Sequence, residues 1–186
     1  MVKTNDAAGQ TLQTRIAPLK ESIRNIPDFP TPGILFRDIT PLLSNPELYR
    51  SAIDLMSEPY TKNKVDYIVG IESRGFILAS AMAYTLNSGL VLIRKKGKLP
   101  HKTHSVTYAL EYGQDSLEIH QDAFAKDASI LIVDDVLATG GTAKAAIELV
   151  EKTGGKVAGI AFLIELAALK GREKISSYPI SSLIQF

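Results

Sequence analysis

The stretch from Ile130 to Val150 constrains the fold and the chemistry of this chain more than any other. Ile130 to Val133 is an unbroken apolar segment, which is typical of a strand buried on both faces. Asp134 and Asp135 follow, a short loop then closes in Thr-Gly-Gly-Thr, and an alanine-rich run after Thr142 favours a helix. The sequence therefore predicts a strand, a loop and a helix N-terminus in immediate succession.

The loop has the composition of an anion-binding site. A helix N-terminus presents free backbone N–H groups and the positive end of the helix dipole. Gly140 and Gly141 lack Cβ atoms, so the backbone can approach phosphate oxygens closely, and the hydroxyls of Thr139 and Thr142 can donate further hydrogen bonds. A P-loop is excluded because the Gly-Lys-Ser/Thr ending is missing. A phosphate group is the expected ligand.

The two acids beside the loop require a different partner. Asp134 and Asp135 would repel a phosphate unless they accept hydrogen bonds from sugar hydroxyls or face a hydrated Mg²⁺ ion. The combined pattern suggests a phosphorylated sugar. Taken separately, the acids also fit a solvated strand end, and Thr-Gly-Gly-Thr also fits a turn that caps the next helix.

Composition narrows the class of protein. A chain of 186 residues with 45% hydrophobic and 22% charged residues suits one globular domain, which we place at 1–186. The net charge of +1 gives no sign of a nucleic-acid or membrane partner, and the absence of cysteine removes disulfides and thiolate chemistry. Met1 to Gln13 lacks the apolar core of a signal peptide, so we expect a cytoplasmic protein.

The remaining chain alternates strands and helices. The spacing of Ile16, Leu19, Ile23 and Ile26 predicts an amphipathic helix from Leu12, and the proline-rich segment 27–33 forbids regular structure. Asn45-Pro46 is a helix start. Apolar segments then predict strands at 65–71, 90–93, 130–133 and 157–166 and a helix at 76–86. This order favours a parallel α/β sheet with ligands at the carboxyl ends of its strands.

A basic segment follows the strand at 90–93. Arg94, Lys95 and Lys98 lie near Gly97 and Pro100, where a mobile loop could bring cations to a polyanionic leaving group. The next segment alternates from Ser105 to Tyr112 and is expected to turn at Gly113-Gln114-Asp115 into a second strand, which makes a hairpin that projects from the sheet. We place the flexible loop and hairpin at about 94–120.

The whole run from Ile130 to Val150 resembles the phosphoribosyl pyrophosphate (PRPP) signature of type I phosphoribosyltransferases. Other segments resemble the adenine-specific members of that family over nearly the whole chain; they are residues 29–39, 66–76, 94–100, 110–113 and 169–174. The resemblance implies the type I phosphoribosyltransferase fold. In that α/β fold, helices flank a central, mostly parallel sheet, with a small N-terminal hood at about 27–41 and a mobile β-hairpin flap.

The resemblance also implies an activity. Adenine-specific members of the family join adenine to the ribose of PRPP and release AMP and pyrophosphate, a step of purine salvage. Mg²⁺ acts as the cofactor and is carried by the pyrophosphate and ribose of the substrate, with no direct protein ligand. A homodimer is the usual assembly.

Roles for PRPP contacts follow from the same resemblance. The segment Ala138, Thr139, Gly140, Gly141 and Thr142 would hold the 5′-phosphate, and Asp134 with Asp135 would hold the ribose hydroxyls. Pyrophosphate would be met by Arg74, Arg94, Lys95 and Lys98, some of them from the neighbouring subunit. Glu72 replaces the aspartate that is common in the family loop of residues 72–74, a loop that often contains a non-proline cis peptide bond.

The base site and the proton acceptor are likewise implied. Phe36 would stack on one face of adenine and Val136 would cover the other, where the family more often has a larger aliphatic residue. Backbone groups of Leu35 and Arg37 would read the exocyclic amine and a ring nitrogen, which disfavours 6-oxopurines. Glu111 is the candidate for the proton transfer that adenine requires.

Two alternatives stay open at this stage. An enzyme for hypoxanthine, guanine or xanthine would have the same fold, although no side chain that selects an oxo group is evident near the C-terminal strands. A regulator that binds PRPP without catalysis would be expected to add a DNA-binding domain and a basic face. His101 and His104 are interpreted as solvated residues of the basic loop.

Overall fold

The computed structural model describes residues 11–109 and 114–186. Its backbone contacts group the chain into two compact units, Met1–Asp54 and Leu55–Phe186. The helix α3 (Pro46–Ser57) runs through the boundary between them.

The first unit pairs a short antiparallel ribbon with helices. Its elements are α1 (Leu12–Ser22), β1 (Arg24–Pro27), β2 (Leu35–Asp38), α2 (Thr40–Ser44) and the start of α3. The predicted cap of α3 is confirmed, because Oδ1 of Asn45 accepts hydrogen bonds from the backbone N–H of Glu47 (3.0 Å) and of Leu48 (3.1 Å).

The predicted extent of the first helix is wrong at its C-terminal end. α1 stops at Ser22, Ile23 is its extended C-cap, and Ile26 lies in β1 opposite Phe36. The residue before a proline is disfavoured in the helical region, so Pro27 pushes Ile26 toward an extended conformation. Pairing with β2 then outweighs the helical spacing of the isoleucines.

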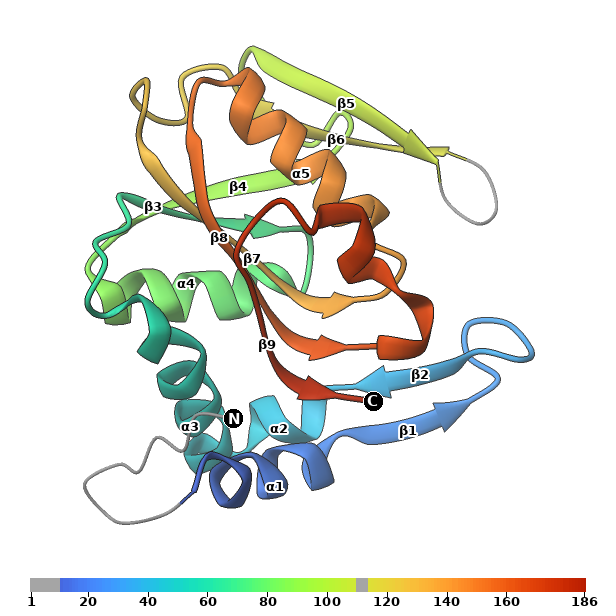
Figure 1. Cartoon of the computed structure of the whole chain (residues 1–186). Coiled ribbons are helices and arrows are strands. Elements are labelled where there is room, and N and C mark those ends of the chain that lie inside the picture. The colour runs from blue at the N-terminus through green and yellow to red at the C-terminus, as the bar shows by residue number, and fades with distance from the viewer. Residues whose placement is uncertain (1–10, 110–113) are drawn as a thin grey trace. The chain divides into compact units, whose positions relative to one another are not determined.

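The second unit contains a seven-stranded sheet in the order β5-β6-β4-β3-β7-β8-β9 (Figure 1). Its strands are β3 (Tyr67–Ile71), β4 (Gly89–Lys95), β5 (Thr103–Ala109), β6 (Gln114–His120), β7 (Ser129–Leu137), β8 (Lys156–Glu165) and β9 (Ile180–Gln185). The ladders β4-β3-β7-β8-β9 are parallel, and β6 pairs antiparallel with both β4 and β5. The predicted central, mostly parallel sheet is therefore confirmed.

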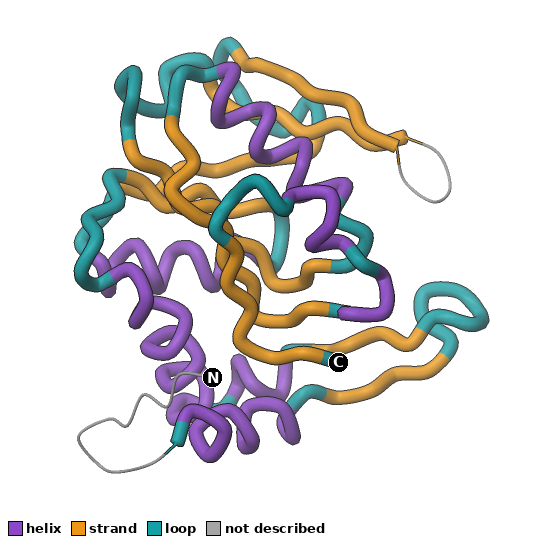
Figure 2. Tube along the Cα trace, viewed as in Figure 1, coloured by secondary structure: helices purple, strands orange, loops and turns teal. Residues whose placement is uncertain are grey.

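The predicted hairpin is the β5–β6 pair, and both strands are seen along their length in Figure 2. Two short segments near it differ from the prediction. Gln114 and Asp115 belong to β6 rather than to a turn, because they pair with Ala109 and Tyr108. Arg94 and Lys95 belong to β4, where they pair with Glu118 and Leu117. The backbone hydrogen bonds of this sheet extend further than the apolar segments suggested.

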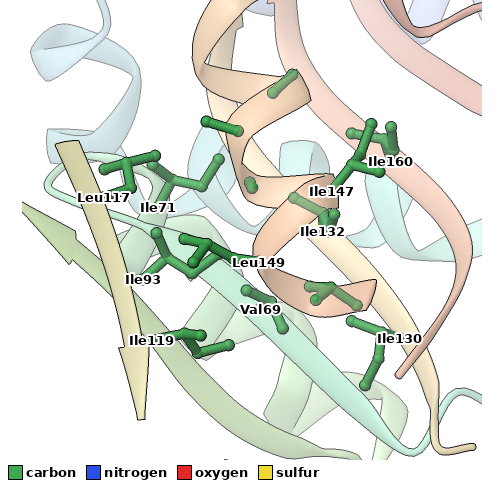
Figure 3. Close-up of a cluster of buried hydrophobic side chains, with 14 of the residues drawn as sticks. Val69, Ile71, Ile93, Leu117, Ile119, Ile130, Ile132, Ile147, Leu149 and Ile160 are labelled. Atoms are coloured by element: carbon green, nitrogen blue, oxygen red, sulfur yellow. The ribbon is translucent and has the colours of Figure 1, made fainter. Parts of the chain in front are cut away.

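Two helices cover opposite faces of the sheet. α5 (Gly141–Lys152) closes one face over a buried apolar cluster, in which Val69, Ile132 and Ile160 form a row across β3, β7 and β8. Figure 3 shows Ile147 and Leu149 of α5 among these strand side chains. α4 (Gly75–Leu86) packs on β3 and β7 and contributes no residue to this cluster.

The C-terminal part returns the chain to the sheet. Gly154, with φ of 95°, follows α5 and confirms the predicted helix stop. After β8, two short 3₁₀ helices, η2 (Ala167–Leu169) and η3 (Gly171–Ile175), lead into β9, which borders β8. Another short 3₁₀ helix, η1 (Glu58–Tyr60), precedes β3. Within residues 11–109 and 114–186, no helix has the length and apolarity needed to cross a membrane.

Candidate active site

The carboxyl ends of β3, β7 and β8 lie next to one another, because these strands are parallel neighbours. The loops that leave them are residues 72–74, 138–140 and 166–170. In open parallel sheets, ligands bind at this edge. A ligand site of the second unit is therefore expected at this edge.

The loop between β7 and α5 has the geometry of a phosphate site. Gly140 is the N-cap of α5 with φ of 80° and makes no side-chain capping hydrogen bond. The first backbone N–H groups of a helix have no partner within it, so those that begin at Gly141 face outward at the positive end of the helix dipole. A pocket of about 60 Å³ opens here, and its lining includes all five predicted residues from Ala138 to Thr142 together with Val136.

Asp134 and Asp135 end β7 beside this pocket. Oδ1 of Asp134 accepts the backbone N–H of Asp135 at 2.9 Å. A methyl group on Gly75 would lie 2.7 Å from the same oxygen, so the Asp134 carboxylate lies against the first turn of α4. Burial, together with the adjacent charge of Asp135, raises the pKa of Asp134 well above its ordinary value. A buried carboxyl of this kind gains from any hydrogen-bond donor that reaches it.

Asp135 has an unused acceptor. Its Oδ2 atom is buried and lies 2.7 Å from Nε of Arg74 as an ion pair, yet it accepts no hydrogen bond from the described residues. Burial raises the pKa of Asp135, and the charge of Arg74 opposes that rise. Beside this ion pair, Oδ2 can still accept a hydrogen bond from a sugar hydroxyl or from a water molecule of hydrated Mg²⁺.

A second, larger cleft of about 360 Å³ adjoins these acids. It gathers residues from β3, β4, the hairpin, β7 and α5; they are Glu72, Ser73, Arg74, Lys95, Tyr108, Asp115, Leu117, Asp134, Asp135 and Thr142. The peptide bond between Glu72 and Ser73 is cis, which confirms the expected form of this loop. Arg74 and Lys95 thus lie on the cleft, while Arg94 and Lys98 are not among its lining residues.

Arg94 and Lys98 are held by Glu72. Oε1 of Glu72 lies 2.6 Å from Nζ of Lys98 and 3.3 Å from Nη2 of Arg94, and Oε2 accepts the backbone N–H of Lys95 at 3.0 Å. Burial would raise the pKa of Glu72, but hydrogen bonds from Lys98, Lys95 and Arg94 outweigh it and lower that pKa to about 2. Glu72 therefore ties the end of β3 to the basic segment.

The side chain of Lys95 lies on the face of β4 opposite to that of Arg94. Val91 and Ile93 belong to the cluster under α5, so by alternation Lys95 points to that face and Arg94 to the opposite one. Nζ of Lys95 pairs with Oδ2 of Asp115 at 3.0 Å. Asp115 is a cleft residue that sequence reasoning missed, because it was assigned to a turn; the alternation of the hairpin strand was the available signal.

Leu35, Phe36 and Arg37 lie on β2 of the first unit, where the ring of Phe36 meets that of Phe29 edge-on with centroids 5.1 Å apart. Glu111 lies outside the described residues. His101 precedes β5, whereas His104 lies within it opposite Ile119, so the expected loop position is wrong for His104; neither histidine lines a cleft. Among the residues that the structure describes, no group of acids and histidines forms a metal-binding cluster.

A larger hollow of about 550 Å³ lies at the amino ends of β3, β4 and β7. Its acid Asp66 already caps the sheet, since its Oδ2 accepts the backbone N–H of Ser129 at 2.9 Å. The hollow holds no glycine loop at a helix N-terminus and lies on the wrong edge for a parallel-sheet ligand. The clefts at the carboxyl ends of the strands are therefore the candidate site, although this hollow is larger.

Known proteins share both the sequence and the fold. Residues 38–185 match the family model described as "Phosphoribosyl transferase domain". The adenine phosphoribosyltransferase of Brachyspira hyodysenteriae is 57% identical over 168 residues, which are 90% of this chain and 99% of that protein. The crystal structure of adenine phosphoribosyltransferase from Rhodothermus marinus has 51% identity and a TM-score of 0.90, over 94% of this chain and 99% of the other.

A third relative was solved with ligands. Adenine phosphoribosyltransferase from Saccharomyces cerevisiae, in complex with adenine and an imino-altritol bisphosphate, has 41% identity and a TM-score of 0.87. The match covers 92% of this chain and 99% of the yeast chain.

Proposed function

The chain belongs to the adenine phosphoribosyltransferases of the phosphoribosyl transferase domain family, and from this premise we propose that it transfers the phosphoribosyl group of PRPP to adenine in purine salvage. The products are AMP and pyrophosphate. One observation of the structure carries the proposal. Two adjacent carboxylates, those of Asp134 and the buried Asp135, lie directly beside a glycine loop at the N-terminus of α5.

Each part of the donor has a fitting partner in the second unit. The 5′-phosphate suits the N–H groups and hydroxyls of the 138–142 loop. The ribose hydroxyls suit the carboxylate oxygens of Asp134 and Asp135, and Oδ2 of Asp135 can accept a hydrogen bond from one of them. The pyrophosphate suits the cleft that contains Arg74 and Lys95. We propose that Arg94 and Lys98 complete the pyrophosphate contacts, and that they do so by exchanging Glu72 for the incoming phosphate oxygens.

The reaction forms one bond and breaks another at the same carbon. A ring nitrogen of adenine bonds to C1′ of the ribose, while the bond from C1′ to the pyrophosphate oxygen breaks and its electron pair leaves with pyrophosphate. The attacking nitrogen loses a proton, for which Glu111 is the proposed acceptor. Cations fixed in the cleft stabilise the negative charge that develops on the leaving group.

Mg²⁺ is the proposed cofactor and fits the acids without a cage of protein ligands. Carried by the pyrophosphate and ribose oxygens of PRPP, it would neutralise part of the charge on the leaving group. Asp134 and Asp135 would orient its water molecules or the ribose hydroxyls, in keeping with the buried acceptor on Asp135.

We propose, from the family resemblance, that Phe36 and Val136 contact the faces of adenine and that backbone groups of Leu35 and Arg37 recognise its polar edge. Val136 lies in the lining of the 138–142 pocket, which agrees with a place beside the ribose.

Glu111→Gln tests the proposed proton acceptor. General-base assistance is typically worth about a hundredfold to ten-thousandfold in rate, so we expect kcat to fall within that range while the affinity for PRPP is kept. Steady-state kinetics and calorimetric titration with PRPP measure the two quantities. Unchanged kcat would remove Glu111 from the mechanism.

The function itself is tested by incubating the purified protein with Mg²⁺ and PRPP and, separately, adenine, hypoxanthine or guanine, with nucleotides separated by chromatography. We expect AMP from adenine and no product from the 6-oxopurines. IMP or GMP would favour an oxopurine enzyme. Binding of PRPP without any product would favour a regulator.

A homodimer and a cytoplasmic location complete the proposal. Support for a dimer comes from an apolar patch on α4 and β4, formed by Ile77, Tyr84, Leu90 and Leu92, which are 40%, 91%, 43% and 37% exposed. Exposed apolar side chains gathered on adjacent elements commonly mark protein–protein contacts. The cytoplasmic location is proposed from the composition of the chain.

A further inference from the structure

The phosphate loop is supported from behind by the segment that follows β8. A Cβ atom on Gly140 would lie 2.5 Å from the carbonyl oxygen of Gly171, and one on Gly171 would lie 2.8 Å from the backbone nitrogen of Gly140. The backbones of the loop and of η3 therefore touch with no side chain between them. Figure 1 shows η3 beside the start of α5. Any shift of η3 toward α5 must displace the loop.

An ion pair fastens the start of η3 to the sheet, while Ile175 at its end packs in the buried apolar cluster. Nε of Arg172 donates to Oε1 of Glu165 at 3.0 Å and Nη2 donates to Oε2 at 2.6 Å, a bidentate contact. Glu165 is the last residue of β8 and is 6% exposed. The same Arg172 side chain also donates to the hydroxyl of Ser182 (2.9 Å) and the carbonyl of Ile180 (3.3 Å) on β9. Arg172 thus fastens η3 to two strands at once.

The turn between these points is fixed by its backbone. The N–H of Leu166 donates to the carbonyl of Leu137 at 2.9 Å, and the N–H of Ala167 donates to the carbonyl of Phe186 at 3.0 Å. Gly171 directly precedes Arg172, and its backbone is the part of this segment that contacts the loop. The contact between η3 and the loop is therefore made by backbone atoms and not by side chains.

We propose that Arg172 and Glu165 are positioning residues for the 5′-phosphate site, because their ion pair holds Gly171 against the loop and keeps the N–H groups of 139–142 aimed at the ligand. The inference rests on the proposed function for the identity of the ligand. Neither residue lines a site cleft, so the pair acts through the backbone of Gly171.

The first experiment needs no ligand. Amide hydrogen exchange of residues 138–143 is compared between the wild type, Arg172→Gln and a matched control, Lys156→Gln. Lys156 also lies on β8 and forms an ion pair at 2.9 Å with Asp127, but at the amino end of the strand. We expect faster exchange of the loop in Arg172→Gln alone. Equal exchange in both variants would overturn the inference.

The second experiment reads the site directly. Calorimetry with ribose 5-phosphate and steady-state kinetics are applied to Arg172→Gln, Arg172→Lys and Glu165→Gln. Misplacement of binding groups by small distances costs up to about a hundredfold, so we expect roughly ten- to hundredfold weaker ribose 5-phosphate binding and a higher KM for PRPP. KM for adenine should change little. The ribose 5-phosphate affinity of Arg172→Lys should lie between those of the wild type and Arg172→Gln. The Arg172→Gln/Glu165→Gln double variant should lose less of this affinity than the product of the two single losses.

Gly171→Ala provides an independent arm if a charge variant folds poorly. It keeps the ion pair but adds a methyl group against Gly140, so weaker ribose 5-phosphate binding is again expected. Equal losses of adenine and ribose 5-phosphate affinity, or none, would overturn the inference. Failure of the wild type to make AMP would instead overturn the proposed function. The hydrogen-exchange comparison would still test whether Arg172 positions the loop.

Discussion

At the scale of single residues, Glu72 shows how a departure from a family pattern acquires a structural role. Its carboxylate reaches Arg94, Lys98 and the backbone of Lys95, and its side chain is 9% exposed. The methylene that glutamate has beyond aspartate extends this reach to the basic segment. Two cations of the proposed pyrophosphate site thereby share one carboxylate as a partner and are positioned before any substrate arrives.

The depressed pKa of Glu72 predicts a pH-dependent contribution to stability. Its pKa is about 2 in the folded protein and 4.5 ordinarily, so the contribution is complete above pH 4.5 and is lost as pH falls toward 2. The partner cations are partly exposed, which limits its size to about 1–2 kcal/mol. Urea unfolding of the wild type and Glu72→Gln across this range measures it. A gap between the two proteins that did not close at low pH would contradict the assignment.

Some residue roles could be predicted from the sequence and others could not. The loop 138–142 and its two acids were predictable because strand, loop and helix are contiguous in the chain. Asp115 and Gly171 were not, since each acts on a partner far away in sequence, Lys95 and Gly140 respectively. The pairing of Arg94 with Glu72 depends on the parallel β3–β4 register and was equally invisible.

At the scale of elements, β7 is the strand on which the site depends. It lies between β3 and β8 in the parallel ladder and delivers both acids and the loop from its carboxyl end. Its apolar residues were predicted well, because a strand buried on both faces has a continuous apolar sequence. The helical spacing of Ile23 and Ile26 misled because a proline and a strand partner outweighed it.

Ile132→Ala is expected to lower the free energy of unfolding by about 2–5 kcal/mol, because it opens a cavity in the row formed with Val69 and Ile160. Ile34, which is 42% exposed and lies outside the apolar patch, provides the control, since Ile34→Ala should cost far less. Denaturant unfolding of both variants measures the difference. Equal losses would place the stabilising core elsewhere.

At the scale of the whole molecule, the patch on α4 and β4 bears on assembly. Leu90 and Leu92 alternate with the buried residues Val91 and Ile93, so they face away from the cluster under α5. Tyr84, at 91% exposure, lies on the helix that packs on that other face. The sequence predicted a dimer only through resemblance, because exposure cannot be read from an apolar segment.

Replacing Tyr84 and Leu90 together with lysine is expected to shift the proposed homodimer to a monomer, because two charges would be buried at the interface without partners. Sedimentation velocity over a range of protein concentrations measures the shift. Tyr49→Lys, on α3 and outside the patch, serves as a control and should leave the assembly unchanged. A wild-type protein that sediments as a monomer would remove the dimer from the proposal.

Because Arg94 and Lys95 point to opposite faces of β4, substitutions at the two positions should complement each other between subunits. Arg94 shares its face with the apolar patch, whereas Lys95 opens into the cleft of its own chain. In the proposed dimer, Arg94 could then serve the partner's cleft while Lys95 serves its own. Two inactive proteins, Arg94→Ala and Lys95→Ala, should on mixing and reassembly regain activity, because each hybrid contains one undamaged site. No recovery would show that both cations act within one chain.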